Sequence, residues 1–273
     1  MKYTKKAFSC VWLALVLILT YLPIIIIAVY SFTDAKIVGG SIGGGSLDNY
    51  SNLFKNEELR EMIIGTVLLA LGSALIATVL ATLGAIGTHY SKRITKTILN
   101  TANQVPVVNA DVVTGFSACV LLIILLGISK DTYVPLVIGH VVLCAPFVYL
   151  SIIPKLKQLD NNLYEAALDL GATPAQALFK VVLPQLIPGI LSGFMLAVTL
   201  SLDDYFITTY TKPATFDTIS TYVFNATKGN QTEVKTALWA LSTLIFLLVL
   251  ITVVVMNVLS IKRKEKNKNE KTA

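Results

Sequence analysis

The stretch that decides how this sequence is organised is polar and lies between two apolar segments: residues Pro154 to Pro188, PKLKQLDNNLYEAALDLGATPAQALFKVVLPQLIP. It is long for a simple connection, and its local signals are helical. Asn162 followed by Glu165 resembles a capping box, which predicts a helix start at Asn162. An apolar stripe at helical spacing follows, formed by Leu163, Ala166, Ala167 and Leu170. Gly171 is then the residue type that commonly ends a helix.

A second helix is predicted directly after this glycine. Thr173 is a good N-cap, Pro174 suits the first helical turn, and Gln176 completes a Thr-x-x-Gln capping box. Pro184 and Pro188 then mark the entry into the next apolar segment. The stretch therefore predicts a compact helix–Gly–helix loop.

The charge of this loop separates two interpretations of its role. An amphipathic helix that lies on lipid headgroups is usually basic. The loop is instead nearly balanced, with the charged residues Lys155, Lys157, Lys180, Asp160, Glu165 and Asp169. Balanced charge favours a docking surface for a protein partner, and an interfacial helix is the alternative.

Composition places the rest of the chain in a membrane. Of its 273 residues, 55% are hydrophobic and 14% are charged, whereas about 25% are charged in typical soluble proteins. The mean hydropathy is +0.72. A water-soluble fold of this size cannot bury so much apolar surface. The formal net charge of +6 does not predict nucleic-acid binding, because the basic clusters flank apolar segments, as orientation in a membrane requires.

Six apolar stretches qualify as spans of a bilayer, which takes about 20 mostly apolar residues. They are Phe8–Tyr30, Met62–Thr88, Val105–Gly127, Tyr133–Ile153, the shorter Leu186–Leu202, and Thr236–Leu259. The first is too long for the apolar core of a cleaved signal peptide, so we expect a retained anchor. The second contains Gly65, Gly72, Gly84 and Gly87. Because small residues let helices approach closely, we expect this span to pack inside the bundle.

Basic residues are distributed unevenly over the predicted loops. Six spans put both termini on one side of the membrane. If that side is the cytoplasm, 15 of the 22 Lys and Arg residues lie inside and 7 outside, which predicts cytoplasmic N- and C-termini. We expect three segments: an anchor with an external loop over residues 1–61, a five-span core with the polar loop over 62–259, and a basic tail over 260–273.

The polar loop also carries a longer, position-specific motif. Glu165-Ala166-Ala167, Gly171 and Val181-x-Leu183-Pro184 match the pattern EAA–x3–G–x9–I–x–LP, with valine in place of isoleucine. In this the chain resembles the permease subunits of ABC importers. The resemblance implies an all-α type I permease fold with six transmembrane helices. It also implies that the loop is a coupling helix for a separate ATPase, with the contact residues Glu165, Ala166, Ala167, Gly171, Leu183 and Pro184.

The likeness extends over essentially the whole chain. The segments LDNYSNLF, VVNADVV, CAPFVYL and TLSLDDYFIT are similar to the second permease subunit of spermidine/putrescine importers. This implies a non-enzymatic subunit of the bacterial inner membrane that forms half of a polyamine pathway. The implied partners are a dimer of a cytoplasmic ATPase, a second homologous permease, an external polyamine-binding protein and the lipid bilayer. The resemblance implies neither a cofactor nor binding to nucleic acid. Permeases for ferric iron or phosphonate are the alternative within the same group.

Carboxylates inside a span are costly and therefore indicate function. Asp203 and Asp204 end the fifth span on the outer side, and Asp111 lies near the start of the third. A polyamine carries several ammonium groups, so its path needs spaced carboxylates and aromatic faces. We predict that the path is lined by Asp203, Asp204, Tyr205 and Asp111, with Phe147 and Tyr149 deeper in the membrane. In the alternative, Asp203 and Asp204 cap a helix end or face water, and Asp111 caps a helix broken after Pro106.

Other functions receive less support from the sequence. A secondary transporter driven by an ion gradient usually has internal repeats, and we find none. A membrane-embedded enzyme needs a nucleophile and a base at comparable depth, and the sequence shows no such set. The glycines between residues 39 and 45 lack the lysine of a phosphate-binding loop, so they predict a flexible linker. The two histidines and the three cysteines have no neighbouring residues at the spacing of metal ligands, so we interpret them as packing residues. They are His89, His140, Cys10, Cys119 and Cys144.

Overall fold

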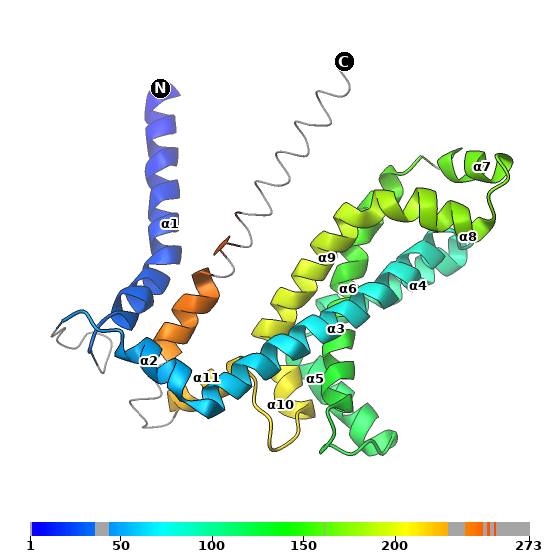
Figure 1. Cartoon of the computed structure of the whole chain (residues 1–273). Coiled ribbons are helices and arrows are strands. Elements are labelled where there is room, and N and C mark those ends of the chain that lie inside the picture. Colours follow the sequence, from blue (N-terminus) through cyan, green and yellow to red (C-terminus); the bar gives the residue numbers. More distant parts are fainter. Residues whose placement is uncertain are drawn as a thin grey trace. The chain divides into compact units, whose positions relative to one another are not determined.

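The computed structural model describes residues 2–35, 44–160, 162–228 and 238–247, together with residues 250, 251 and 254. Over these residues the chain is helical, apart from an isolated β-bridge between Thr33 and Gly45. The chain divides into two compact units, one of residues 1–60 with 225–273 and one of residues 61–224. The predicted all-α class is confirmed (Figure 1). The predicted basic tail and most of the glycine-rich linker lie outside the described residues.

The first unit contains a long apolar helix, whose C-terminal end is fixed by contacts from a second, short helix. Its helices include α1, Lys2–Ser31, and α2, Asp48–Lys55. The side-chain amide of Asn49 donates to the carbonyl oxygens of Ser31 and Thr33, at 3.1 and 3.0 Å. The hydroxyl of Tyr50 lies 2.9 Å from the Oγ of Ser31. Because the last carbonyl groups of a helix have no partner within it, these side chains from α2 fix the point at which α1 ends.

Three long helices pack together in the second unit (Figure 1). They are α3, Glu57–His89, which begins in the first unit, α6, Val134–Gln158, and α9, Leu183–Asp203. Their shared core includes Ala74, Ala77, Ala81, Ala85, Cys144, Val148, Ile152, Leu156, Leu186 and Ala197. The buried alanines of α3 recur every three or four residues, which places them on one face of the helix. Small side chains on this face let α3 lie close to its neighbours.

Helix α3 packs inside the second unit, as predicted, but three of its four glycines do not take part in a close approach within the described chain. A Cβ atom at Gly72, Gly84 or Gly87 would meet nothing within 4 Å, so no other part of the described chain packs closely against these positions. The alanines form the buried face instead. A close approach that needs glycine occurs on α9, where a Cβ at Gly189 would lie 2.9 Å from the Cγ of Lys155 on α6.

The third apolar stretch does not form one continuous span. Helix α4, Arg93–Val108, is followed by α5, Asp111–Cys119, and by the π-helix η1, Val120–Leu125. The backbone is extended at Asn109 and Ala110, and the helices on the two sides are bent by 105°. The predicted span from Val105 is therefore wrong at its start, because residues 105–108 belong to α4.

The fifth span is longer than predicted. Helix α7, Asn162–Asp169, precedes α8, Pro174–Ala177, which passes through the π-helix η2, Leu178–Val182, into α9. Together α8, η2 and α9 form an apolar helix of 30 residues. Pro184 does not end it, because the turn before the proline is already wide: the N–H of Leu183 donates to the carbonyl of Leu178. The second helix of the predicted loop is thus the first part of this span.

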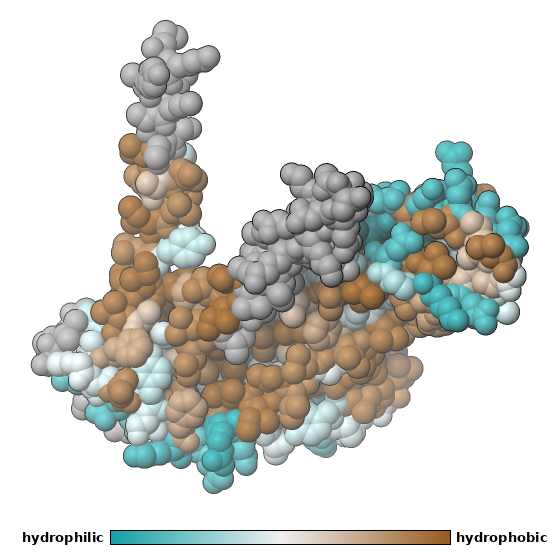
Figure 2. Space-filling view, turned by 45° about the horizontal axis from the view of Figure 1, so that its top comes forward, coloured by the Kyte–Doolittle hydropathy of each residue, from teal (hydrophilic) through white to brown (hydrophobic). Residues whose placement is uncertain are grey.

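The described chain has four helices that are long and apolar enough to cross a membrane, or five if the bent pair counts as one span. The predicted sixth span lies largely outside the described residues, which include the apolar helix Leu238–Leu247. The count of six therefore stays a prediction. Leucine side chains such as Leu68, Leu75 and Leu83 are more than half exposed along α3. Figure 2 shows hydrophobic residues over the sides of the long helices, as in a multi-pass membrane protein.

Two short helices complete the second unit and its border. They are α10, Phe206–Thr211, and α11, Ile219–Lys228. The ring of Phe216, in the segment between them, lies against Gly65 of α3, where an added Cβ would be 2.8 Å from the ring. The N–H of Ile219 donates to the hydroxyl of Thr66 at 3.0 Å. These contacts bring the segment after α10 back to α3.

Candidate functional site

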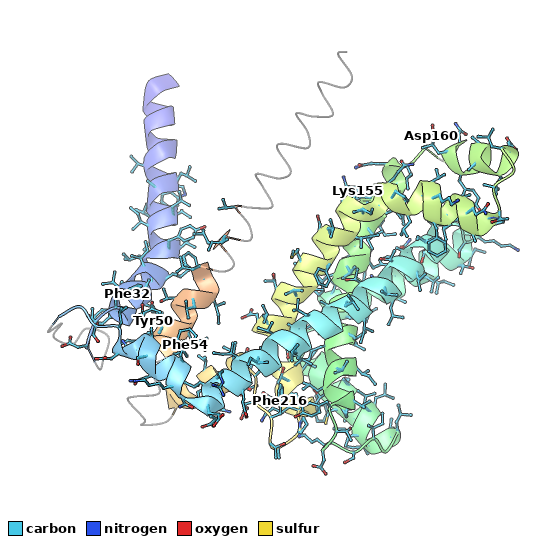
Figure 3. All side chains as sticks on the ribbon, in the orientation of Figure 1. Phe32, Tyr50, Phe54, Lys155, Asp160 and Phe216 are labelled. Atoms are coloured by element: carbon cyan, nitrogen blue, oxygen red, sulfur yellow. The ribbon has the colours of Figure 1, made fainter. Side chains whose placement is uncertain are left out.

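The residues predicted to be functional gather at two ends of the second unit. Helices α7 and α8 lie at one end of the long helices, and α10 lies at the other (Figure 1). Figure 3 shows Lys155 and Asp160 at the first end and Phe216 at the second. We refer to residues 160–184 as the loop end, and to α10 with the residues that contact it as the α10 end.

At the loop end, Gly171 terminates α7 in a left-handed conformation with a φ of +86°. The N–H of Ala172 donates to the carbonyl of Ala167 at 3.0 Å, and the N–H of Gly171 donates to that of Leu168 at 2.9 Å. These are the two hydrogen bonds of a Schellman motif, so the predicted helix end is confirmed. A Cβ at Gly171 would meet nothing within 4 Å. The position therefore requires glycine for its backbone conformation and not for space.

Two side chains cap the helices of the loop. The predicted box is present at α8: the N–H of Gln176 donates to the hydroxyl of Thr173 at 3.3 Å, and the side chain of Gln176 accepts from the N–H of Thr173 at 3.1 Å. At α7 the carboxylate of Asp160 accepts from the N–H of Asn162 at 3.0 Å. The capping side chain there is thus Asp160, and not Asn162 as predicted.

Most of the apolar stripe predicted for α7 is exposed, and only Ala167 is half-buried. Leu170 is 88% exposed and Leu163 is 42% exposed, and Phe179 in the neighbouring η2 is 61% exposed. Glu165 and Ala166, the first two residues of the sequence motif, are exposed as well. The second unit therefore presents apolar side chains beside a carboxylate at a polar end of the molecule, where Figure 2 shows hydrophilic residues gathered. Exposed apolar groups with a polar rim are typical of a protein-binding surface.

The loop is held to the core through aromatic contacts. The ring of Tyr164 in α7 lies 5.2 Å from that of Tyr90, which follows α3. Burial, and to a lesser extent the nearby phenol of Tyr164, raises the pKa of Tyr90, so this phenol stays neutral. Leu183 is half-buried against the core, whereas Pro184 is exposed. One side of the loop is thus anchored while the motif residues on the other side are left uncovered.

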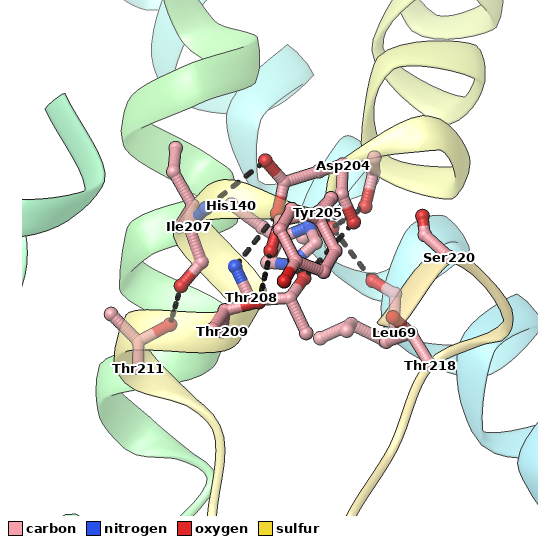
Figure 4. Close-up of polar contacts among 12 residues, drawn as sticks. Leu69, His140, Asp204, Tyr205, Ile207, Thr208, Thr209, Thr211, Thr218 and Ser220 are labelled. Atoms are coloured by element: carbon pink, nitrogen blue, oxygen red, sulfur yellow. Dashed lines mark hydrogen bonds and ion pairs between the residues drawn. The ribbon is translucent and has the colours of Figure 1, made fainter. Parts of the chain in front are cut away.

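At the α10 end, Asp204 is buried and its carboxylate caps α10. Its Oδ1 accepts from the N–H of Ile207 at 3.2 Å, and its Oδ2 accepts from the N–H of Thr208 at 2.7 Å. The hydroxyl of Thr208 donates to the same Oδ2 at 2.8 Å (Figure 4). Of the two sequence-based interpretations of Asp204, the helix cap describes this geometry.

A buried histidine lies next to this cap. The Nε2 of His140 is 3.0 Å from the hydroxyl of Thr208 and 3.7 Å from the Oδ2 of Asp204 (Figure 4). Its Nδ1 is 2.7 Å from the hydroxyl of Ser201, which lies 3.1 Å from the hydroxyl of Ser73. The side chains come from α3, α6, α9, α10 and the α9–α10 junction. His140 is thus a hydrogen-bonded packing residue, as predicted, although it also connects these helices.

The backbone of α10 approaches its neighbours closely. Ile207 is fully buried between two glycines. A Cβ at Gly139 of α6 would lie 2.6 Å from the Cγ2 of Ile207, and a Cβ at Gly115 of α5 would lie 3.1 Å from its Cα. A side chain at Gly139 would require Ile207 to shift, and one at Gly115 would be tight against its backbone, so the two glycines make room for α10.

The remaining residues predicted for a substrate path differ in exposure. Asp203 is exposed, and its carbonyl accepts from the hydroxyl of Ser220 at 3.1 Å. Tyr205 is half-buried, with its ring 4.2 Å from that of Phe224. Asp111 is exposed in the first turn of α5, directly after the break from α4. These positions offer two accessible carboxylates and an aromatic face.

The two aromatic residues expected deeper in the membrane are less accessible. Tyr149 is buried and its hydroxyl donates to the side chain of Asn100 in α4 at 2.6 Å, while Phe147 is half-buried. A largely apolar cavity of about 250 Å³ lies at the break between α4 and α5. Its lining includes Val105, Pro106, Asn109, Thr114, Ser117 and Leu121.

Sequence reasoning missed the hydroxyl residues of the α10 end. Ser201, Asp204 and Thr208 are three and four residues apart, which is the spacing of side chains on one helical face. This was a local signal for a connected cluster. Ser73 and His140 gave no such signal, because their partners come from distant parts of the sequence.

Comparison with known proteins defines the class of the chain. Residues 90–266 match the family of binding-protein-dependent transport system inner membrane components, and the chain belongs to this family. It is a multi-pass transport subunit of the ABC importer permease class and not an enzyme. Such a permease works together with other subunits of its transporter.

Its relatives narrow the likeness further. The chain is 31% identical to the spermidine/putrescine transport system permease protein PotC of Haemophilus influenzae, over 89% of this chain and 92% of the relative. It is 32% identical to the putrescine transport system permease protein PotI of Escherichia coli, over 82% and 80%. Two crystal structures of a bacterial alginate ABC transporter contain chains of the same fold, with TM-scores of 0.69 and 0.71. They share 17% and 19% identity with this chain and cover 92% and 93% of it, and 93% and 96% of their own chains are matched.

Proposed function

We propose that this chain forms half of the translocation pathway of an importer for polyamines such as spermidine and putrescine, driven by a separate cytoplasmic ATPase. The cargo is supported by the likeness to polyamine permeases over more than four fifths of the chain. The use of an ATPase is supported by the loop end. Its motif residues are held in a fixed conformation by Gly171 and Thr173, while the apolar side chains beside them are left uncovered.

The single observation that carries this proposal is the exposed face of α7. Leu163 in this helix of 8 residues and Leu170 directly after it are exposed, and exposed apolar side chains beside polar ones are typical of a surface that another chain covers. The interfacial alternative, insertion of this face into lipid, is less favoured because the loop is not basic. The partner that we propose is the cytoplasmic ATPase, with contacts at Glu165, Ala166, Ala167, Gly171, Leu183 and Pro184.

This proposal also assigns an orientation. If α7 faces the ATPase, the loop end is cytoplasmic and the α10 end is external. The N- and C-termini are then cytoplasmic, in agreement with the distribution of basic residues. A second homologous permease supplies the other half of the pathway, and an external binding protein delivers the cargo to the α10 end.

For the substrate path we propose Asp203, Tyr205 and Asp111 as the residues that contact a polyamine. The carboxylates of Asp203 and Asp111 are exposed, and Tyr205 presents an aromatic ring beside Asp203. Ammonium groups are bound well by carboxylates and by aromatic faces. Asp204 was included in the sequence-based prediction, but both of its carboxylate oxygens already accept from α10. We therefore propose that Asp204 acts on the path through the position of α10.

The cargo is tested by uptake of labelled spermidine and putrescine in cells that lack this chain and in the same cells complemented with it. We expect uptake only in the complemented cells, and competition by an excess of either polyamine. Uptake of ferric iron or a phosphonate, with no loss of polyamine uptake on deletion, would support the alternative cargo instead.

The role of the loop is tested with Glu165→Ala in the assembled transporter. Glu165 is exposed and makes no contribution to the core, so we expect the chain to assemble normally. Uptake should fall while ATP hydrolysis by the partner continues. Gln185→Ala is a matched control, because Gln185 is also exposed on the same stretch and lies outside the motif. Normal uptake by Glu165→Ala would argue against a coupling role for this face.

A further inference from the structure

A row of five polar contacts crosses the α10 end from the carboxylate of Asp204 to a backbone carbonyl of α3 (Figure 4). The row begins at Asp204 Oδ2, which lies 2.8 Å from Thr208 Oγ1, and this hydroxyl lies 3.0 Å from the Nε2 of His140. On the other side of the ring, the Nδ1 of His140 lies 2.7 Å from the Oγ of Ser201. The Oγ of Ser201 lies 3.1 Å from the Oγ of Ser73, which lies 2.6 Å from the carbonyl oxygen of Leu69. The side chains of the row are buried. We refer to it as the polar row.

The polar row needs more hydrogens than a neutral histidine supplies. Each of its five contacts requires one hydrogen between the two atoms. The carbonyl at one end and an ionised carboxylate at the other only accept. The hydroxyls of Thr208, Ser201 and Ser73 supply one hydrogen each, and a neutral imidazole supplies one more. One of the five contacts is then left without a hydrogen, between two buried acceptor atoms.

One additional proton completes the row. If the imidazole of His140 carries hydrogens on both nitrogens, Nε2–H donates to Thr208 and Nδ1–H donates to Ser201. Ser201 then donates to Ser73, Ser73 donates to the carbonyl of Leu69, and Thr208 donates to Asp204, so that every contact is filled. Weaker alternative acceptors at 3.3 Å, the carbonyls of Asp204 and Ala70, change the destination of a hydrogen but not the count.

The geometry also indicates where this proton resides. A proton on Asp204 in place of His140 would also fill the row, with Asp204 donating to Thr208 and Thr208 donating to the Nε2 of His140. Its carboxylate, however, already accepts two backbone N–H groups of α10, from Ile207 and Thr208, and such donors stabilise the ionised form. Among the described residues, the donors directed at the imidazole are the hydroxyls of the row. Its Nε2 lies 3.7 Å from the carboxylate, at the distance of an ion pair.

We propose that His140 is held as an imidazolium paired with the carboxylate of Asp204, and that this one buried proton ties α3, α6, α9 and α10 together. His140 is in this sense a positioning residue for the α10 end. The titratable groups nearest to it are Asp204 itself and Cys144, one turn further along α6, whose thiol donates to the carbonyl of Ala197. Asp203 and Asp111 on the adjoining elements are exposed.

The consequence is a two-state contact between helices. With the proton present, the hydroxyls of Ser73 and Ser201 form a hydrogen bond that joins α3 to α9. Without it, one contact of the row has to open, because two acceptors face each other. The contact between Ser73 and Ser201 joins α3 to α9 directly, so it is one of the interhelical contacts that the proton keeps filled. This inference does not depend on the cargo.

Nitrogen NMR of histidine tests the proposal on the full chain in lipid nanodiscs. The sequence contains two histidines, His89 and His140, so the substitution His89→Gln leaves a single histidine signal. With the remaining ring labelled with ¹⁵N, we expect both nitrogens of His140 to show the shifts of protonated nitrogens at neutral pH. A single protonated nitrogen, whether Nε2 or Nδ1, is the signature of a neutral ring and overturns the proposal.

Variants separate this role from simple packing. Asp204→Asn keeps an oxygen that can cap α10 but removes the charge, so we expect the imidazolium signature to be lost. Asp203→Asn is the matched control and should retain it, because Asp203 is exposed. Ser201→Ala removes the acceptor of Nδ1–H and should also return His140 to a neutral form. An imidazolium that persists in Asp204→Asn would contradict the pairing, and the signal of the His89→Gln chain alone still decides the question if a variant fails to fold.

Discussion

The loop end and the α10 end of the second unit satisfy their polar groups in opposite ways. At the loop end, caps at Thr173 and Asp160 and the turn at Gly171 hold short helices whose side chains are exposed. At the α10 end, buried polar atoms are paired with one another, and the described chain leaves no buried side-chain nitrogen or oxygen without a partner. This difference indicates that the loop end is suited to contact with another chain, whereas the buried polar groups of the α10 end find their partners within this chain.

This contrast makes distinct predictions for substitutions at the two ends. Changes at the α10 end should lower the stability of the chain, because they leave buried polar groups unpaired or overfill a packed site. Changes at the loop end should leave the core intact and affect transport.

The largest effect is expected for Asp204→Ala. The variant leaves two backbone N–H groups and the hydroxyl of Thr208 without their acceptor, and it removes the carboxylate 3.7 Å from the imidazole of His140. Removing one member of a buried ion pair typically costs about 3–5 kcal/mol. We expect a loss of this size in the free energy of unfolding in detergent micelles. Asp203→Ala, at the exposed neighbour, should change it by less than about 0.5 kcal/mol, and equal losses in the two variants would remove the contrast between them.

The next largest effect is expected for Gly139→Ala. Its Cβ would lie 2.6 Å from Ile207, which is fully buried and therefore cannot move away. Overfilling a packed site costs about 1–3 kcal/mol, which should appear as a lower unfolding temperature. The control is Gly72→Ala, where a Cβ meets nothing within 4 Å. That variant should be unchanged or slightly more stable, because alanine favours a helix more than glycine does. If Gly139→Ala unfolded at the temperature of the unaltered chain, α10 would not be packed as described.

At the loop end, Gly171→Ala tests whether conformation alone matters. The left-handed conformation disfavours a residue with a Cβ by about 1–2 kcal/mol, although there is space for the side chain. The strain is confined to the end of α7, so we expect the core to unfold normally while polyamine uptake falls and ATP hydrolysis by the partner persists. Measuring uptake and hydrolysis in the same reconstituted transporter checks this. Gly171→Asn should be milder, since asparagine tolerates this conformation better.

The smallest effect is expected for Thr173→Ala. The loss of an N-cap costs about 1 kcal/mol, and the capping box of α8 lies at an exposed end of a long helix. We expect slightly faster amide exchange in α8 and a modest reduction in uptake. Thr173→Ser retains the hydroxyl and should restore both. A variant without the hydroxyl that exchanges and transports normally would show that the box does not contribute to the loop's conformation.

The sequence predicted the loop end better than the α10 end. The turn at Gly171 and the box at Thr173 are set by residues within four positions of each other, so local rules were sufficient. The N-cap of α7 was assigned to Asn162 because the nearby Asp160 was not considered. At the other end, the pairing of His140 with Ser201 and Thr208 joins residues more than 60 positions apart, and no local pattern contains that information.

The spans show the same division. Hydropathy located the long apolar helices of the described chain, because the bilayer imposes a minimum length of apolar chain. Hydropathy did not detect the 105° bend after Val108, nor the continuity of the helix through Pro184, because both depend on backbone geometry at one or two residues. The four glycines of α3 suggested close packing, yet the helix packs through its alanines, because rotation about the helix axis is set by its neighbours.

By itself, the sequence determined that this chain is embedded in a membrane and has a helix–Gly–helix loop, since composition and short-range caps act through neighbouring residues and through the solvent. The permease class came from the resemblance of the motif between Glu165 and Pro184 to that of ABC importer permeases. The tertiary structure decided which face of each helix is buried, which carboxylate is free and which is a cap. Asp203 and Asp204 are adjacent and chemically identical in the sequence. One is exposed and the other buried because the chain ends α9 between them and turns Asp204 toward α10 and His140.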